Sequence, residues 1–159
     1  MLSDTHIRPG GSRRLPDAVY EALAQADVVL HAGDVLTRDV LDELSGFAPV
    51  HAVLGNNDDG ILAGMLPETL TVEIGGVRVG MIHDSGPREG RPGRMRRRFP
   101  DAHVVVYGHS HIPYCGEGLE GQLLFNPGSP TDRRAQPHHT FGLLDLHAGS
   151  VRRAEIVEI

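Results

Sequence analysis

The sequence has a single cysteine and no long apolar stretch of the kind that a membrane span or a signal peptide requires. A single cysteine, Cys115, stands among 159 residues, so no internal disulfide can form, which favours a reducing compartment. No stretch approaches the roughly 18 consecutive apolar residues of a membrane span. Asp4 comes too early to leave room for the apolar region of a signal peptide. We therefore expect a cytoplasmic protein that makes no membrane contact.

Positive charge is also in short supply, because the formal net charge is −6 at pH 7. General nucleic-acid binders usually carry a basic surface, so nucleic acid is a disfavoured partner. The length suits one domain, and 40% hydrophobic residues are enough to build an ordinary core. We predict a single domain over residues 1–159.

Helix-like segments alternate with short apolar runs through the first two thirds of the chain. Residues 15–26 and 37–47 carry apolar side chains on one side and are expected to be helices. The apolar runs 27–32, 49–54 and 102–107 are expected to be buried strands. This alternation predicts βαβ units and a mostly parallel sheet.

Antiparallel features dominate the remaining strand-like segments. Residues 68–74 and 77–82 flank a Gly-Gly pair and predict a β-hairpin. Residues 123–125, 140–146 and 150–159 are expected to form a second, antiparallel sheet. The favoured architecture is thus α/β, with two sheets and the helices outside them.

An arginine-rich segment at residues 87–100 has two interpretations. It could form a rim that steers anionic substrates, or one solvated face of a helix. We favour the solvated helix face.

Side chains that bind metals occur just after the apolar runs and near the N-terminus. They are Asp4, His6, Asp34, Asn56, His83, His109 and His111. Each alone could be a turn or packing residue, but in an open α/β sheet the loops after the strands meet at one edge. The His-x-His pair is the strongest single signal, because alternate residues of an extended segment point the same way. We expect these side chains to converge on one rim.

The order of these motifs is more specific than any one of them. The succession D-x-H, G-D, G-N, a strand-end histidine and G-H-x-H resembles the ligand signature of calcineurin-like metallophosphoesterases, and Asn126-Pro127-Gly128-Ser129 follows as in small members. The resemblance spans most of the chain and is strongest to compact single-domain phosphodiesterases of bacteria and archaea. It implies a four-layer α/β/β/α sandwich, in which two mixed β-sheets are flanked by helices and the first strand is truncated.

The resemblance also implies a site for two metals that share Asp34. The first metal would be held by Asp4, His6, Asp34 and His111, and the second by Asp34, Asn56, His83 and His109. Oxygen and imidazole ligands without thiolate suit divalent transition metals, with manganese first and nickel, cobalt, iron or zinc as alternatives. The implied reaction is attack of a hydroxide that bridges both metals on a phosphodiester, without a covalent enzyme intermediate.

Asn57 departs from the family pattern. Many members have a histidine there that contacts phosphate and protonates the leaving group, whereas asparagine can donate a hydrogen bond but cannot serve as general acid. We expect Asn57 to contact phosphate and the enzyme to prefer good leaving groups. Asp58, the usual partner of that histidine, would then only cap the turn.

The start of the chain departs as well. Relatives have a full apolar strand before the Asp-x-His motif, but only Met1 and Leu2 lie ahead of it here. We expect either a start codon further upstream or a truncated form. With so short a stub, Asp4 and His6 would lie on a frayed terminus.

Two other function classes stay open. The retromer scaffold subunit has this fold and works mainly through protein contacts, so a catalytically weak binding scaffold is the main alternative. A nuclease is the second, and only the arginine-rich segment supports it. The expected partner is a small phosphodiester substrate, and small relatives suggest a homodimer or homotetramer.

Overall fold

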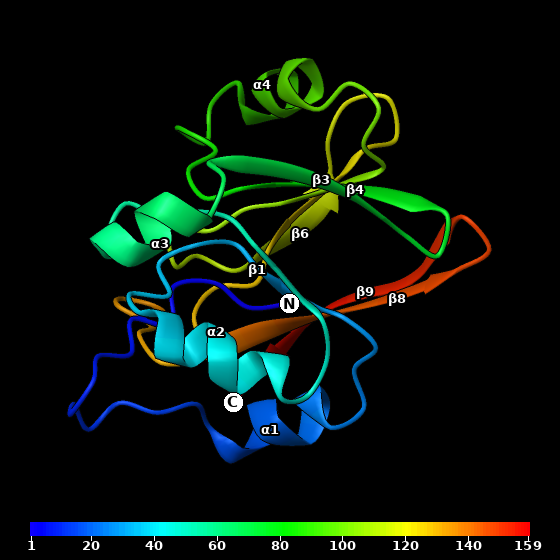
Figure 1. Cartoon of the computed structure of the whole chain (residues 1–159). Coiled ribbons are helices and arrows are strands. Elements are labelled where there is room, and N and C mark those ends of the chain that lie inside the picture. Colours follow the sequence, from blue (N-terminus) through cyan, green and yellow to red (C-terminus); the bar gives the residue numbers. More distant parts are fainter.

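The chain folds into four layers in the order helices, sheet, sheet, helix (Figure 1). The computed structural model describes all 159 residues. In chain order the elements are α1 (Asp17–Leu23), β1 (Val29–His31), α2 (Arg38–Ser45), β2 (Val50–Ala52), α3 (Gly60–Met65), β3 (Thr69–Ile74), β4 (Val77–Ile82), α4 (Arg91–Arg98), β5 (Val104–Val106), β6 (Tyr114–Glu117), β7 (Leu123–Asn126), β8 (Thr140–His147) and β9 (Ser150–Glu158). The predicted four-layer sandwich is confirmed, and no helix has the length and apolar character that crossing a bilayer requires.

One layer is a five-stranded mixed sheet in the order β3-β4-β5-β7-β6. Its inner strands run parallel, and the outer pairs β3–β4 and β6–β7 are antiparallel. Side chains alternate along β5, so Val104 and Val106 enter the core between the sheets while Val105 packs beneath α4. The three-valine run therefore serves two separate cores.

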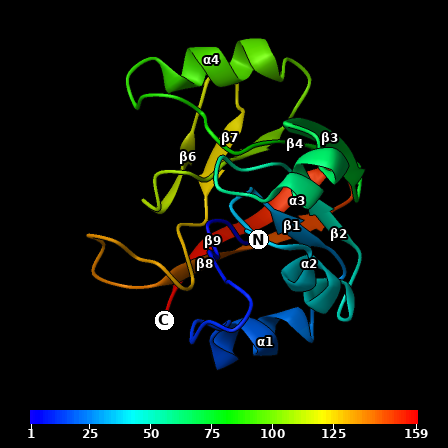
Figure 2. The same ribbon diagram turned by 60° about the vertical axis from the view of Figure 1, so that its left-hand side comes forward.

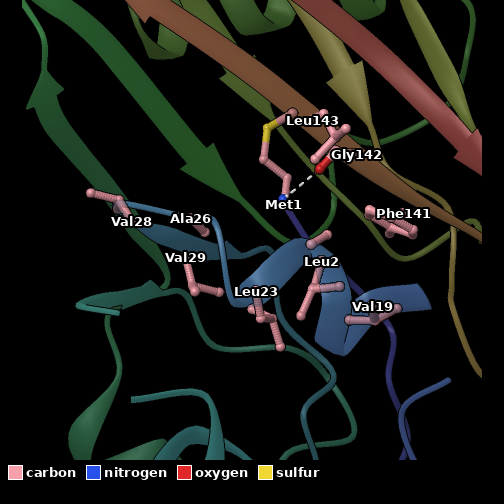
Figure 3. A pocket seen from close by; sticks show the side chains of 11 residues that line it. Met1, Leu2, Val19, Leu23, Ala26, Val28, Val29, Phe141, Gly142 and Leu143 are labelled. Carbon is pink, nitrogen blue, oxygen red and sulfur yellow. Dashed lines mark hydrogen bonds between the residues drawn. The ribbon is translucent and has the colours of Figure 1, made fainter. Parts of the chain in front are cut away.

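The other sheet consists of two strand pairs, β1–β2 and β8–β9, which the first two residues of the chain join. Leu2 bonds to β1 in parallel, with its amide 2.8 Å from the Leu30 carbonyl and its carbonyl 2.9 Å from the Ala32 amide. On the other side the Met1 amine donates to the Gly142 carbonyl at 2.6 Å (Figure 3). Met1 and Leu2 thus form a very short strand that links the β1–β2 pair to the β8–β9 pair.

The expectation of a frayed N-terminal segment is wrong. Ser3, Asp4 and Thr5 are fully buried. The amides of Asp4 and His6 donate to the carbonyls of Gly33 and Asp34 at 3.0 and 3.1 Å. Because both edges of this segment find backbone partners, a short strand is sufficient to order it.

Helices cover the outer faces of both sheets. Figure 2 shows α4 on the opposite side of the molecule from α1 and α2. Val19 and Leu23 of α1 join Leu44 of α2 in one apolar cluster against the sheet that contains β1 and β8. Met95 of α4 packs on the five-stranded sheet. Together with a third cluster between the two sheets, these two clusters give two helical layers and a central double sheet.

Three features differ from the sequence-based expectations. Residues 123–126 do not join β8 and β9; β7 instead lies parallel to β5 in the five-stranded sheet, because Leu124 packs under α4. Strand β6 was not predicted, since it is largely exposed and lacks an alternating pattern. Helix α3 was not predicted either; it is only six residues long, and the Asp59 side chain caps it.

Candidate metal centre

The structure brings all seven predicted ligand side chains together at one end of the sheets. They extend from the loops after β1, β2, β4 and β5 and from the segment after Leu2. An unbroken chain of short contacts connects them, and the members are Asp4, His6, Asp34, Asn56, His83, His109 and His111. The strand-end positions in the sequence therefore predicted the convergence correctly.

One part of the centre, here called the first pocket, is formed by Asp4, His6 and His111. The Nε2 atoms of the two histidines lie 3.2 Å apart, and that of His111 is 3.3 Å from Oδ1 of Asp4. This Oδ1 is buried and has no hydrogen-bond partner. A buried carboxylate oxygen without a donor is costly, and a cation is the natural partner for it and two imidazole lone pairs. The donor set therefore fits a divalent metal.

The second pocket is formed by Asn56, His83 and His109. Oδ1 of Asn56 lies 3.0 Å from Nε2 of His83 and 2.9 Å from Nδ1 of His109. Oδ1 of Asn56 can accept from His109, and from His83 when that ring carries a proton on both nitrogens. A cation bound here would have to replace those bonds.

Asp34 lies between the two pockets. Its Oδ2 is 3.5 Å from Nε2 of His6, and its Oδ1 is 3.4 Å from Nε2 of His83. Asn57 donates to both oxygens, from its amide at 2.8 Å and from its side chain at 2.7 Å. Burial acts to raise the pKa of Asp34, but the contacts with His83 and Asn57 outweigh it and hold that pKa well below its usual value. The carboxylate is therefore ionised and available to both pockets.

The backbone of the centre is unusual. Five of the seven ligand residues have left-handed φ angles although none is glycine: Asp4 (54°), His6 (45°), Asp34 (57°), His109 (68°) and His111 (57°). Each such residue costs about 1–3 kcal/mol and persists only where its surroundings enforce it. The local conformation is thus imposed by tertiary contacts and not by the local sequence.

Glycines allow the ligand loops to approach one another closely. A Cβ on Gly108 would lie 1.8 Å from Oγ of Ser3, and one on Gly55 would lie 2.1 Å from the Asp34 amide. Both distances are far below van der Waals contact. The glycines of the G-N and G-H-x-H motifs are therefore required by packing.

Backbone carbonyls orient two of the ligand histidines. Nδ1 of His83 lies 2.7 Å from the Ala32 carbonyl, and Nδ1 of His111 contacts the Asp132 carbonyl. Donation from Nδ1 leaves the Nε2 lone pair pointing into the centre. Burial lowers the pKa values of both rings, but Asp34 beside His83 and Asp4 beside His111 raise them more. For His6, by contrast, burial outweighs the nearby carboxylates and lowers the pKa.

Two residues near the centre have roles that sequence reasoning missed or left open. Asp58 does more than cap a turn: its carboxylate accepts from the amides of Leu36 and Gly55 at 2.8 and 2.7 Å, which ties the two ligand loops together. His31 is fully buried, and its Nε2 is 3.2 Å from Oγ1 of Thr5. Burial lowers the pKa of His31 to about 3, so it is neutral.

The arginine-rich segment forms α4, but a purely solvated face is the wrong interpretation for two of its residues. Arg94 donates to the carbonyls of Ser85 and Glu89 at 3.2 and 2.7 Å and also contacts that of Pro87. Arg91 donates to the Gly86 carbonyl at 3.1 Å, and its guanidinium lies 4.8 Å from the centre of the Tyr107 ring. These arginines fasten the segment that follows His83.

Comparisons with known proteins agree with this geometry. Residues 1–149 match the family model described as the calcineurin-like phosphoesterase superfamily domain. A probable metallophosphoesterase of Methanothermobacter thermautotrophicus is 40% identical over 82% of this chain and 76% of its own length. Another, from Methanocaldococcus jannaschii, is 35% identical over 82% of this chain and 67% of its own length. Among solved structures, Vps29 of Entamoeba histolytica complexed with zinc is 26% identical, with a TM-score of 0.76 over 99% of this chain and 96% of that one.

Proposed function

Because the chain belongs to the calcineurin-like phosphoesterase superfamily, we propose that it is a binuclear phosphodiesterase that uses Asp34 as the shared ligand. The first pocket, with Asp34, would hold one divalent ion, and the second pocket, with Asp34, would hold the other. When bound, two such ions supply an acidified water and positive charge for the developing charge on phosphorus. Family membership implies divalent metals, and manganese is our first choice among Mn, Ni, Co, Fe and Zn.

The observation that carries this proposal is the unpartnered carboxylate oxygen of the first pocket. Oδ1 of Asp4 is fully buried, faces His6 and His111, and receives no hydrogen bond. In two groups, Asp4 with His6 and His111, and Asp4 with Asp34 and His83, the candidate ligand atoms all lie within 4.8 Å of one another. Such spacing lets one ion contact three ligands at once.

Charge supports an anionic substrate with a single negative charge. The centre's two carboxylates, Asp4 and Asp34, contribute −2, and two divalent ions would contribute +4. The net excess of +2 would be balanced by a hydroxide and one phosphodiester anion. A small phosphodiester is therefore the substrate class that we propose.

Asn57 supports a preference for good leaving groups. Its side chain lies 2.7 Å from the shared carboxylate, where it can donate to a bound phosphate. An amide has no proton to give at neutral pH, so a leaving group that needs protonation would depart slowly.

A substrate panel tests the proposal. The chelator-treated protein would be assayed with and without Mn²⁺ on aryl diesters, cyclic nucleotides, dinucleotides and monoesters. We expect metal-dependent hydrolysis that is fastest on aryl diesters. Equal rates in chelator and in Mn²⁺, or a clear preference for alkyl monoesters, would contradict it.

A binding scaffold is the second candidate, favoured by the similarity to Vps29 structures. In that case the chain would work through protein contacts with little hydrolysis. Turnover separates the two, whereas metal content alone does not, because a Vps29 structure also holds zinc. Metal-dependent hydrolysis of an aryl diester supports the enzyme, and a metal-loaded chain without hydrolysis supports the scaffold.

A further inference from the structure

A loop outside the predicted ligand set makes hydrogen bonds to both parts of the chain that supply the first pocket. It covers residues 126–132, starts at the last residue of β7 and includes the Asn-Pro-Gly-Ser motif. The loop is anchored on β8, since Oγ1 of Thr140 donates to the Pro127 carbonyl at 2.7 Å and the Thr140 amide donates to the Ser129 carbonyl at 2.9 Å. It is therefore a fixed support and can hold other segments in place.

Ser129 is the residue that connects the loop to Asp4. Its hydroxyl is buried and donates to the Asp4 carbonyl at 2.7 Å. The same oxygen accepts from the amides of Thr131 and Asp132 at 3.3 and 2.8 Å. Thr131 then donates through its own hydroxyl to the Thr5 carbonyl. Two successive carbonyls of the ligand-bearing N-terminal segment are thus held from this loop.

The two ends of the loop, Asn126 and Asp132, hold the His-x-His segment. Nδ2 of Asn126 donates to the Gly108 carbonyl at 3.0 Å and to Oγ of Ser110 at 3.1 Å. The Asp132 carbonyl contacts Nδ1 of His111, which fixes the ring with Nε2 toward Asp4. Asp4 and His111 are both left-handed residues, so each needs an external restraint of this kind.

We propose that the 126–132 loop is the positioning element of the first pocket, with Ser129 holding Asp4 and the Asp132 carbonyl holding His111. The loop supplies none of the predicted ligands and acts through them. The inference rests on the proposed function, because it assigns the loop a role in the metal affinity of that centre. The loop reaches the second pocket only through Asn126, which bonds to the residues on either side of His109, so changes at Ser129 or Thr131 should leave that pocket's affinity unchanged.

The test compares Ser129→Ala with the full-length wild type in calorimetric titrations with Mn²⁺ after chelation. His6→Ala and His83→Ala serve as references that identify the binding step of each pocket. Removing such a supporting contact typically weakens metal binding about 10–100-fold, so the first-pocket step should weaken by that factor. The second-pocket step should change by about twofold at most.

Ser45→Ala is a matched control, because Oγ of Ser45 also donates to a backbone carbonyl at 2.7 Å, in the remote helix α2. It should leave both steps unchanged. Ser129→Thr keeps the hydroxyl and should restore most of the lost affinity. If Ser129→Ala does not fold, Thr131→Val removes the neighbouring bond and should weaken the same step alone. Unchanged binding in the folded variants would overturn the inference while leaving the enzyme proposal intact.

Amide hydrogen exchange of the metal-free chain gives a readout that does not depend on metal. In Ser129→Ala the amides of Asp4 and His6 should exchange about tenfold faster, because a buried hydrogen bond is lost. Ser45→Ala should show no such change. If wild type binds no Mn²⁺, the enzyme proposal fails, and the exchange data still decide: unchanged rates at Asp4 and His6 overturn the positioning role, and faster rates support it.

Discussion

The two pockets use similar ligands but differ in how their polar groups are satisfied. In the first, Oδ1 of Asp4 is buried without a partner, and two imidazole Nε2 atoms face each other at 3.2 Å. In the second, Asn56 stands between His83 and His109 and can bond to both rings. A cation entering either pocket replaces contacts between ligand side chains, but only in the first does it also give a buried oxygen its missing partner. The difference teaches that similar ligand sets need not bind metals with equal affinity.

The pockets also differ in what holds them in place. The first depends on a short N-terminal strand and on the 126–132 loop. The second relies on Asp58, which ties the loops after β1 and β2 together. Asp34 alone serves both, so changes at Asp34 should affect the whole centre, and changes elsewhere should affect one pocket.

The largest effect is expected for Asp34→Asn, which removes the charge shared by both pockets. We expect kcat on an aryl phosphodiester in Mn²⁺ to fall by about 10³-fold, as for loss of a preorganised electrostatic group. Asp42→Asn is a control, since Asp42 is an exposed acid on α2 that pairs with Arg38. A loss smaller than about tenfold would mean that the two pockets do not depend on a shared carboxylate.

Asn57→His tests the leaving-group preference that we assign to Asn57, the residue beside the shared carboxylate. A histidine at this position would supply the missing proton donor, and general-acid help is typically worth about 10²–10⁴-fold. The ratio of alkyl monoesterase to aryl diesterase activity should therefore rise by about 10²-fold. An unchanged ratio, measured on a variant that still binds two metals, would show that the missing proton donor does not cause the leaving-group preference.

Stepwise Mn²⁺ titration sharpens the comparison directly. A cation in the first pocket gives the buried Oδ1 of Asp4 a partner, and an unsatisfied buried polar group costs about 1–3 kcal/mol, so the first pocket should fill at about tenfold lower concentration than the second. His6→Ala should abolish the tighter step, and His83→Ala the weaker one. Loss of the weaker step in His6→Ala would reverse the proposed order of filling.

The smallest effect concerns His31, which is fully buried and is not one of the predicted metal ligands. Its folded pKa of about 3 is below the ordinary 6.5, so between these values the unfolded chain binds more protons. The free energy of unfolding should therefore fall as the pH is lowered through this window, by up to about 1.4 kcal/mol per pH unit.

Urea unfolding in chelator at pH 7 and pH 5 measures this effect. The wild type should lose about 2 kcal/mol more than His31→Gln over that range, because the variant has no imidazole to protonate. His83 and His111, with raised pKa values, act with the opposite sign and are present in both proteins, so they cancel in the difference. Parallel pH profiles of the two proteins would show that His31 is not held neutral by burial.

The ligand convergence and most of the fold could be predicted from the sequence, because each motif follows a strand and parallel strands end at the same edge. Asp34, Asn56 and His83 were placed on this argument, and their proximity in the structure follows it. The resemblance supplied the pairing of Asp4 with His111. Whether these residues hold metals stays a prediction.

Other features depended on contacts that leave no local pattern. Oγ of Ser129 reaches a carbonyl 125 positions away, and no spacing rule connects Ser129 with Asp4. Arg94 belongs to a run of arginines that looks solvent-exposed, yet three of its nitrogens contact carbonyls of the preceding loop. The partner of β7 was missed for the same reason, since a three-residue apolar run does not identify its neighbour.

The central claim is that one carboxylate is shared by two metals, and anomalous scattering from crystals grown with Mn²⁺ tests it most directly. The account predicts two peaks roughly 3.5–4 Å apart, one on each side of the Asp34 carboxylate. A single peak, or peaks that do not contact Asp34, would contradict it.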